Sequence, residues 1–193
     1  MKTTIIRSYQ RLQRWYLRQS WLRETRRHGV SIHKSIELSG RGDVRPWLKF
    51  GAGSVIEREC TVWCAAEAGS EPSVITGANV FIGRNTYLGA WKPIRIGSDT
   101  LIGAYCYIIS GNHRFAAPDL PVRTQGYEGE PITIGRNVWL GAHVVVLPGV
   151  TIGDNAVVGA ASVVTSSVPG AEIWAGVPAR RIRSVFPNPA KNN

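Results

Sequence analysis

The sequence of 193 residues has little cysteine and no long apolar run. Its three cysteines, Cys60, Cys64 and Cys106, are an odd number without paired spacing, so we expect neither a disulfide framework nor a C-x-x-C metal pair. No stretch approaches the roughly 18 consecutive apolar residues that a membrane-spanning helix needs. The first residues lack the apolar core of a secretory signal, because arginine interrupts them every few positions. These absences predict a cytoplasmic location.

The net charge is also small outside one end of the chain, although the formal net charge of the whole chain is +10. Residues 1–27 hold eight Lys and Arg against the single acid Glu24, a net charge of +7, which leaves +3 for the other 166 residues. The body of the chain is therefore close to neutral, and we expect no nucleic-acid partner. With 44% hydrophobic residues it has enough apolar side chains for one globular domain plus a short accessory segment.

What the sequence does contain is a period of six. An aliphatic residue recurs at every sixth position, a small residue follows it in four cases of six, and a small or β-branched residue stands four positions after it. This period fits neither the 3.6-residue repeat of an α-helix nor the alternation of a long strand. The aliphatic positions are Ile134, Leu140, Val146, Ile152, Val158 and Val164, and the second set is Val138, Val144, Val150, Ala156, Ser162 and Val168.

Short extended segments joined by regular corners satisfy this period, so we predict an all-β solenoid with one aliphatic side chain per hexad pointing inward. It is assigned to residues 30–170, since the same phase returns earlier at Ile82, Leu88, Ile96, Ile102 and Ile108. Residues 114–131 are polar and carry no hexad, which predicts a protruding loop with a functional role. Residues 171–193 would close the open end of the solenoid and finish in a tail.

The basic N-terminus, residues 1–29, is predicted to be an amphipathic helix that ends near Gly29. On a helical wheel one face holds apolar and aromatic side chains, and an arginine stripe lies nearly opposite. Either the helix packs on the solenoid with its arginines in water, or the arginines contact anionic lipid headgroups at the inner face of the cell membrane. The apolar face consists of Ile5, Tyr9, Leu12 and Tyr16, and the stripe of Arg7, Arg11, Arg14 and Arg18.

Three segments in addition to the hexads resemble those of the hexapeptide-repeat acetyltransferases. They are GNHRF at 111–115, TQG…EPITIGRNVWLG at 124–141 and AGVPARRI at 175–182. The chain is most similar to galactoside, maltose and polysaccharide O-acetyltransferases, closely over residues 75–184. The resemblance implies a left-handed parallel β-helix, a homotrimer with active sites between subunits, and acetyl-CoA as co-substrate without a metal. It also implies a sugar or polysaccharide-precursor hydroxyl as the acceptor.

His113 is the candidate catalytic base. It stands five positions after Ile108, off the inward phase and beside the predicted loop. An imidazole can take a proton from a hydroxyl near neutral pH as that oxygen attacks a thioester. In the resembled family a histidine here is the general base of a direct transfer, without an acyl-enzyme. His143 is the rival, but its place in a hexad indicates a structural or peripheral role.

Two residues match acceptor-binding positions of the resembled enzymes. Asn85, in IGRNTYLG, matches an asparagine near the base, where an amide could orient the acceptor or the tetrahedral intermediate. The alternative is an ordinary corner asparagine, because this side chain tolerates left-handed backbone. Trp139 matches a tryptophan beside the acceptor, and the alternative is a partly exposed residue at a subunit contact.

The resemblance also implies an acetyl-CoA groove lined by main-chain groups of the late hexads, with arginines that pair with the phosphates. Ser166 stands where many relatives carry lysine, and one groove residue is alanine where some carry serine. For the arginines the alternative is a solvated tail. The implied residues are Gly141, Ala142, Ala160, Thr165, Arg180 and Arg183.

Other functions stay open at this point. An amino sugar, a serine or an antibiotic is an alternative acceptor, and a non-catalytic β-helix scaffold is an alternative to an enzyme. A carbonic anhydrase on the same solenoid would need three histidines on one zinc ion. Only His113 and His143 lie in the clear hexad region, so zinc chemistry is not expected.

Overall fold

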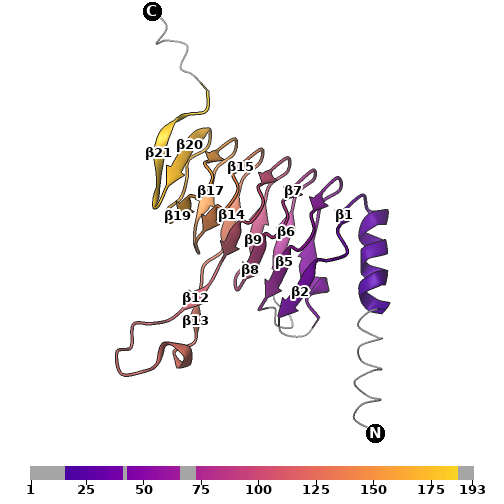
Figure 1. Ribbon diagram of the computed structural model, residues 1–193, viewed down its shortest axis with the longest axis horizontal. Coiled ribbons are helices and arrows are strands. Elements are labelled where there is room, and N and C mark those ends of the chain that lie inside the picture. The colour runs from indigo at the N-terminus through magenta and orange to yellow at the C-terminus, as the bar shows by residue number, and fades with distance from the viewer. Residues whose placement is uncertain (1–15, 41–42, 66–72, 187–193) are drawn as a thin grey trace, which may run out of the picture.

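The computed structural model describes residues 16–40, 43–65 and 73–186, and it contains a stack of short parallel strands wound into three sheets (Figure 1). The predicted first half of the N-terminal helix, residues 1–15, and the predicted tail at 187–193 lie outside the described residues. Successive strands along the chain pass from sheet A to sheet B to sheet C, and each pairs with the strand one coil away. The chain is therefore a left-handed parallel β-helix, as predicted.

The strands are short, and nearly all contribute two to four residues. Sheet A contains β1 (Ser31–Ile32), β4 (Val55–Ile56), β7 (Phe81–Ile82), β10 (Leu101–Ile102), β15 (Trp139–Leu140), β18 (Val157–Val158), β20 (Glu172–Gly176) and β21 (Ala179–Ser184). Sheet B contains β2 (Glu37–Gly40), β5 (Thr61–Cys64), β8 (Tyr87–Ala90), β11 (Tyr107–Ile109), β16 (Val145–Val146) and β19 (Val163–Val164). Sheet C contains β3 (Leu48–Lys49), β6 (Val74–Thr76), β9 (Ile94–Ile96), β14 (Ile132–Ile134) and β17 (Thr151–Ile152).

The hexad aliphatics form the core, which confirms the predicted inward phase. All six from Ile134 to Val164 are at most 1% exposed, and the second set of small residues is buried beside them. The register places equivalent hexad positions of neighbouring coils side by side, and Ile102 thus stands between Ile82 and Leu140. Burying a side chain of this size stabilises the fold by about 1.5–3 kcal/mol, so the stacked column holds the coils together.

The corners need left-handed backbone, and amide or carboxylate side chains link several of them from coil to coil. Asn137 has φ 51°, and its Nδ2 donates to Oδ1 of Asn155 at 2.9 Å. Asn79 makes the same contact with Asp99 at 3.0 Å. Asparagine and aspartate suit these positions because a short polar side chain offsets the cost of the left-handed conformation.

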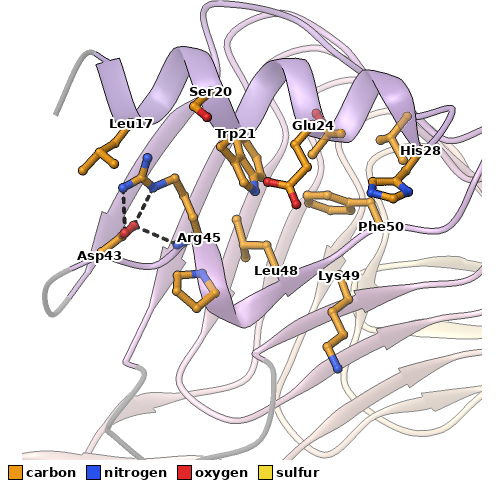
Figure 2. Close-up of a pocket in the computed structure, with 13 residues that line it drawn as sticks. Leu17, Ser20, Trp21, Glu24, His28, Asp43, Arg45, Leu48, Lys49 and Phe50 are labelled. Carbon is orange, nitrogen blue, oxygen red and sulfur yellow. Dashed lines mark hydrogen bonds and ion pairs between the residues drawn. The ribbon is translucent and has the colours of Figure 1, made fainter. Parts of the chain in front are cut away.

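The N-terminal helix, described over residues 16–27, packs across the first coil (Figure 2). Leu22 is buried in the core, and Trp21 packs against it. The helical-wheel prediction was wrong for the two residues that can be checked. Arg18 lies toward the coil, where its Nη2 donates to the carbonyl oxygens of Lys34 and Ile36 at 2.6 Å each, whereas Tyr16 is 66% exposed.

The physical reason lies at the end of the solenoid. Within the part of the chain that the structure describes, no coil precedes the first one to pair with its backbone carbonyls, and buried carbonyl groups need donors. A guanidinium can supply several N–H groups, so the helix turns an arginine inward. Over the described residues, no helix is both long and apolar enough to cross a bilayer.

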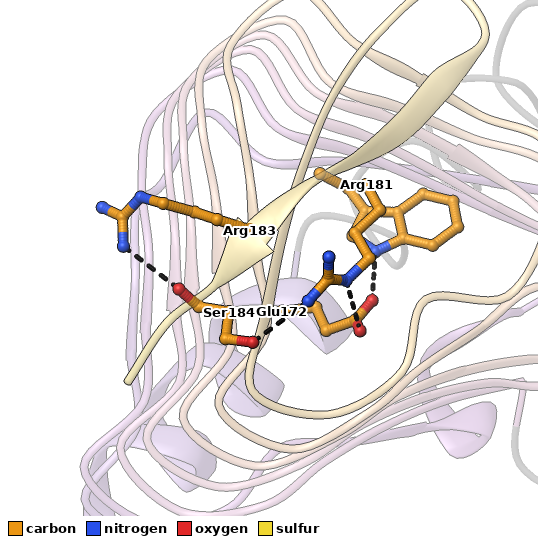
Figure 3. A network of polar contacts seen from close by, with 5 residues as sticks. Glu172, Arg181, Arg183 and Ser184 are labelled. Carbon is orange, nitrogen blue, oxygen red and sulfur yellow. Dashed lines mark hydrogen bonds and ion pairs between the residues drawn. The ribbon is translucent and has the colours of Figure 1, made fainter. Parts of the chain in front are cut away.

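At the other end the chain closes with an antiparallel hairpin of β20 and β21 that continues sheet A from β18. Glu172 anchors this hairpin (Figure 3). Its carboxylate accepts hydrogen bonds from Nε of Arg181 at 2.7 Å and from the indole N–H of Trp174 at 2.8 Å. These two donors, the indole first, lower the pKa of the Glu172 carboxyl.

Candidate active site

His113 lies at the base of a hairpin inserted between sheets B and C. The chain leaves sheet B after β11 and re-enters the coil at β14. In between, β12 (Asn112–His113) pairs antiparallel with β13 (Tyr127–Glu128), and the tip holds the short 3₁₀ helix η2 (Val122–Thr124). The predicted loop is therefore partly a two-stranded ribbon, and its strands fix the position of His113.

Trp91, on the coil that precedes the hairpin, lies against the ribbon's base. A Cβ atom added to Gly111 would lie 2.7 Å from Cγ of Trp91, and one added to Gly129 would lie 2.8 Å from its Cδ1. The buried hydroxyl of Ser110 donates to the carbonyl oxygen of Lys92 at 2.6 Å and accepts from its N–H at 2.9 Å. Two glycines thus let the hairpin approach the indole closely, and a serine ties it to the same corner.

The imidazole of His113 packs on Tyr127, its cross-strand partner, with ring centroids 4.0 Å apart and a 35° tilt. Tyr127 in turn stacks on Trp91 at 4.9 Å. The His113 side chain is exposed, and in the described part of the chain no hydrogen bond reaches its ring nitrogens. Aromatic packing therefore orients this ring, which leaves both nitrogens accessible.

His113 opens into a cavity of about 370 Å³ on the outer face of sheet B, which we call the aromatic cavity. The described residues that line it include no Asp, Glu, Lys or Arg. The lining residues are Trp63, Tyr87, Gly89, Trp91, Tyr107, Ile109, Gly111, Asn112, His113 and Tyr127. Burial, and then the neighbouring tyrosines, raises the pKa of the Tyr87 hydroxyl, so it stays neutral and can donate a hydrogen bond.

None of the three cysteines is suited to act as a competing nucleophile. Burial raises the pKa of both Cys64 and Cys106 to about 11, and burial also raises that of Cys60. These thiols are protonated at neutral pH, and only the thiolate is a strong nucleophile. No group of three potential metal ligands occurs within the residues that the structure describes.

The two acceptor candidates lie elsewhere on the same chain. Asn85 stands at a corner between sheets A and B with φ 57°, and its Nδ2 donates to Glu59 of the neighbouring coil at 3.2 Å. It is not among the residues that line the aromatic cavity. Trp139 is on β15 in sheet A, 54% exposed, beside Leu101 on the next coil. His143 stands at a sheet A–B corner, where it stacks on Tyr105 at 5.0 Å.

The residues predicted for acetyl-CoA fall into three places. Gly141, Ala142 and Ala160 lie at the corner between sheets A and B, whereas Thr165 follows β19 at the far edge of sheet B. The coil itself requires glycine at 141, because a Cβ atom there would lie 2.6 Å from the nitrogen of Ala160.

Arg180 and Arg183 are exposed on β21 at the end of sheet A, and within the described chain they bond only to nearby backbone carbonyls. Figure 3 shows the bond from Arg183 to the carbonyl oxygen of Ser184. Arg181, which lies between them in the sequence, forms an ion pair with Glu172. On a single chain the arginines therefore share sheet A with Trp139, with β18 and β20 between β15 and β21, whereas His113 belongs to the hairpin.

The sequence singled out His113 as a candidate, but its aromatic surroundings were not predicted. A signal was present, because Tyr87 and Tyr107 each stand immediately before an inward aliphatic and so must point outward from the same sheet. They stack at 4.8 Å. Tyr127 had no such signal, since its contact with His113 depends on how the hairpin pairs.

A larger hollow, of about 600 Å³, lies at the N-terminal end between the helix and the first coil (Figure 2). Asp43 and Arg45 on its rim bind each other at 2.6 Å, and the hydrogen bond from Arg45 lowers the pKa of the Asp43 carboxyl. Its lining combines apolar side chains, Leu17, Trp21 and Phe50 among them, with Glu24, His28 and Lys49. We take the aromatic cavity as the candidate active site because it contains His113, the residue predicted as the base, on the hairpin that interrupts the coil.

Comparison with known proteins concerns the repeats of the coil. The family model for bacterial transferase hexapeptide repeats matches residues 131–166, and that for the hexapeptide repeat of succinyl-transferase matches residues 93–111. The chain is 31% identical over 156 residues to a probable acetyltransferase of Mycobacterium tuberculosis, covering 81% of this chain and 48% of the relative. It is 41% identical over 121 residues to the galactoside O-acetyltransferase of Escherichia coli, covering 56% of each. The chain thus spans about half the length of these curated relatives.

Among solved structures, a hexapeptide-repeat acetyltransferase of Vibrio cholerae in complex with acetyl coenzyme A superposes with a TM-score of 0.54 and 26% identity. The match covers 92% of this chain and 79% of that one. The repeats and the coil define a hexapeptide-repeat protein. Along these repeats the chain is similar to acetyltransferases of the hexapeptide-repeat kind.

Proposed function

We propose that this protein is an acetyl-CoA-dependent O-acetyltransferase acting on the hydroxyl of a sugar or polysaccharide precursor, with His113 as general base. The observation that carries the proposal is the position of His113, exposed and unbonded at the mouth of a neutral aromatic cavity. His113 accepts the proton of the acceptor hydroxyl as its oxygen forms a bond to the acetyl carbon. When the carbon–sulfur bond breaks, the imidazolium returns that proton to the departing thiolate.

The charge of the cavity favours a hydroxyl over an amine. An amine acceptor carries a positive charge at neutral pH, and a buried charge needs a partner of opposite sign. The described lining contains no carboxylate. Glu128 is nearby on β13, but its Oε2 lies 3.8 Å from Nε of Arg114, so it already has a cationic partner.

The separation of the candidate residues supports a site between subunits. His113 lies beyond sheet B, whereas Trp139, Arg180 and Arg183 belong to sheet A. The outer face of sheet A also exposes Phe81, Leu101 and Trp139 in adjacent registers, and an exposed apolar stripe of this kind is typical of an interface. A homotrimer that brings sheet A of one copy to the hairpin of the next would assemble one site from both.

For acetyl-CoA we propose that the main chain at Gly141, Ala142, Ala160 and Thr165 lines the groove, and that Arg180 and Arg183 pair with phosphates. The free hydrogen-bonding capacity of these arginines supports this, because a guanidinium pairs strongly with phosphate oxygens. Replacing both by alanine should raise the KM for acetyl-CoA. Arg181→Ala is the matched control and should leave that KM unchanged, since Arg181 serves Glu172.

The test of the main proposal is an acceptor screen that follows CoA release, with neutral sugars, amino sugars, serine and an aminoglycoside. His113→Ala should lower kcat by about 10²–10⁴-fold, the range typical for loss of a general base. His33→Ala is the matched control, because His33 is an exposed histidine of the first coil that bonds Ser35 and lies outside the cavity. Near-full activity of His113→Ala would refute the assignment, and preference for an amine would refute the acceptor class.

The second interpretation of residues 1–29 is that their arginines contact anionic lipid headgroups. We propose that the basic segment brings the enzyme to an anionic membrane face where lipid-linked sugars are assembled. The net charge of +7 supports this, whereas the inward contact of Arg18 removes one arginine from the lipid-facing set. Sedimentation with vesicles containing an anionic lipid, against purely zwitterionic vesicles, tests it, and equal binding to both would refute it.

A further inference from the structure

The aromatic cavity continues past the coil that carries His113 and over two further coils. Trp63 on β5, Gly89 on β8 and Ile109 on β11 are register partners on the outer face of sheet B. All three line the same cavity as His113. Because neighbouring coils are about 4.8 Å apart, the cavity runs roughly 10 Å along the helix axis from the His113 coil.

Gly89 stands at the middle coil of this row. A Cβ atom at this position would lie 2.7 Å from Cε1 of Tyr87 and 3.0 Å from Cγ2 of Ile109, so these two side chains pack close to the backbone and leave room only for glycine. Gly89 is therefore buried beside them and lines the cavity between Trp63 and Ile109.

Four aromatic rings connect the ends of the cavity. His113 packs on Tyr127, Tyr127 stacks on Trp91 at 4.9 Å, and Trp91 lies parallel to Trp63, with ring centroids 6.2 Å apart and an interplanar angle of 5°. Trp63 and Trp91 are partly exposed, so part of each indole ring is accessible to solvent. Aromatic faces that bury area without needing a charged partner suit the apolar faces of sugar rings.

We propose that Trp63 and Trp91 form a second acceptor subsite, which binds a neutral sugar unit next to the one whose hydroxyl faces His113. The acceptor would accordingly be an oligosaccharide or a polymer end, because the cavity is longer than one sugar ring. The absence of Lys and Arg from its described lining disfavours a nucleotide diphosphate or a lipid phosphate at this subsite. This inference rests on the proposed function for the chemistry at His113 only.

The test is acceptor binding as a function of chain length, measured by calorimetry on the full-length protein. The probes are galactose, galactobiose and galactotetraose, with glucose, maltose and maltotetraose as a parallel series. For wild type we expect the tetrasaccharide of at least one series to bind about tenfold more tightly than its monosaccharide. Trp63→Ala should remove most of that gain and leave monosaccharide binding within about twofold, since a single aromatic contact is lost.

Trp63→Phe is the matched control, because it keeps an aromatic face at the same position and should retain most of the gain. Sedimentation velocity and thermal unfolding of each variant check the assembly and the fold. The proposal is overturned if affinity does not rise with length, if Trp63→Ala weakens all lengths equally, if no oligosaccharide binds, or if Trp63→Ala changes the oligomeric state.

CoA release measured with the same probes separates this inference from the proposed function. A Trp63-dependent gain in binding without CoA release from any acceptor would support the subsite and refute acetyl transfer to these sugars. Conversely, CoA release that depends on His113 but neither on acceptor length nor on Trp63 would support the function and overturn the subsite.

Discussion

Gly129→Ala should lower the proposed transferase activity by about 30- to 100-fold, although the change adds only one methyl group. Gly129 follows β13 where the hairpin rejoins the coil. A Cβ atom there would contact the carbonyl oxygen of Ser110 and lie 2.8 Å from Cδ1 of Trp91 and 2.9 Å from Cα of Gly111. Ordinary van der Waals contacts begin at 3.4 Å, and two of these neighbours are backbone atoms that cannot rotate away.

The base of the hairpin must therefore move by about 0.5–1 Å, and a displacement of about 1 Å at a catalytic group can cost 10²-fold in rate. We expect kcat/KM, measured by CoA release, to fall by about 30- to 100-fold, while the thermal unfolding of the coil changes little. Gly126→Ala is the control in the same hairpin, because its Cβ would meet nothing within 4 Å. Its φ of 79° imposes a local strain of about 1 kcal/mol, which should reduce activity by no more than about threefold. If Gly129→Ala kept half of the wild-type activity, the tight fit of the hairpin would not position His113.

Three further predictions concern the coil. Leu140→Ala should lower the free energy of unfolding by about 3 kcal/mol in urea titration, because the side chain is fully buried, and a loss below about 1 kcal/mol would contradict that burial. Burial raises the pKa of Cys64 from 9.0 to about 11, so its contribution to stability is complete below pH 9 and is lost as the pH rises through 11. Urea titrations should show Cys64→Ala losing about 2–3 kcal/mol less than wild type over that interval, and equal losses would refute this. Asn137→Ala should cost about 1–2 kcal/mol, whereas Asn137→Gly should cost less, since glycine tolerates φ 51°; a larger loss for glycine would contradict the backbone explanation.

The coil could be predicted from sequence because its cause is local and repeated. Each hexad has an inward aliphatic such as Ile152 and a small residue near the corner, so each coil forms for the same local reason. The orientation of the N-terminal helix could not be predicted in this way. A helical wheel places Arg18 opposite the apolar face, but it contains no information on the unpaired carbonyl oxygens of Lys34 and Ile36 that draw this arginine inward.

The same distinction between a local pattern and a contact made by the fold applies to the candidate site. His113 could be singled out because it lies off the inward phase in a segment, GNHRF, that resembles the acetyltransferases, and its role as the base stays a prediction. Tyr127 could not be singled out, because its contact arises from the pairing of β12 with β13 inside an aperiodic segment. For Asn85 the sequence left two interpretations open, an acceptor ligand or a corner residue. The structure gives it a left-handed backbone and a hydrogen bond to Glu59, as expected of a corner residue, and a contact with the acceptor stays a prediction.

In a regular coil every outward position on a sheet is equivalent, so the repeat alone cannot create a pocket. The aromatic cavity exists where two departures from the repeat meet. The hairpin adds His113 and Tyr127 above the surface of sheet B, and Gly89 removes a side chain from it. The inward positions beneath are Leu88 and Ile108, and they make the same core contacts whatever stands outside. Residues that determine the acceptor, Trp63 among them, can therefore change with little cost to the fold, whereas the glycines at the hairpin base cannot.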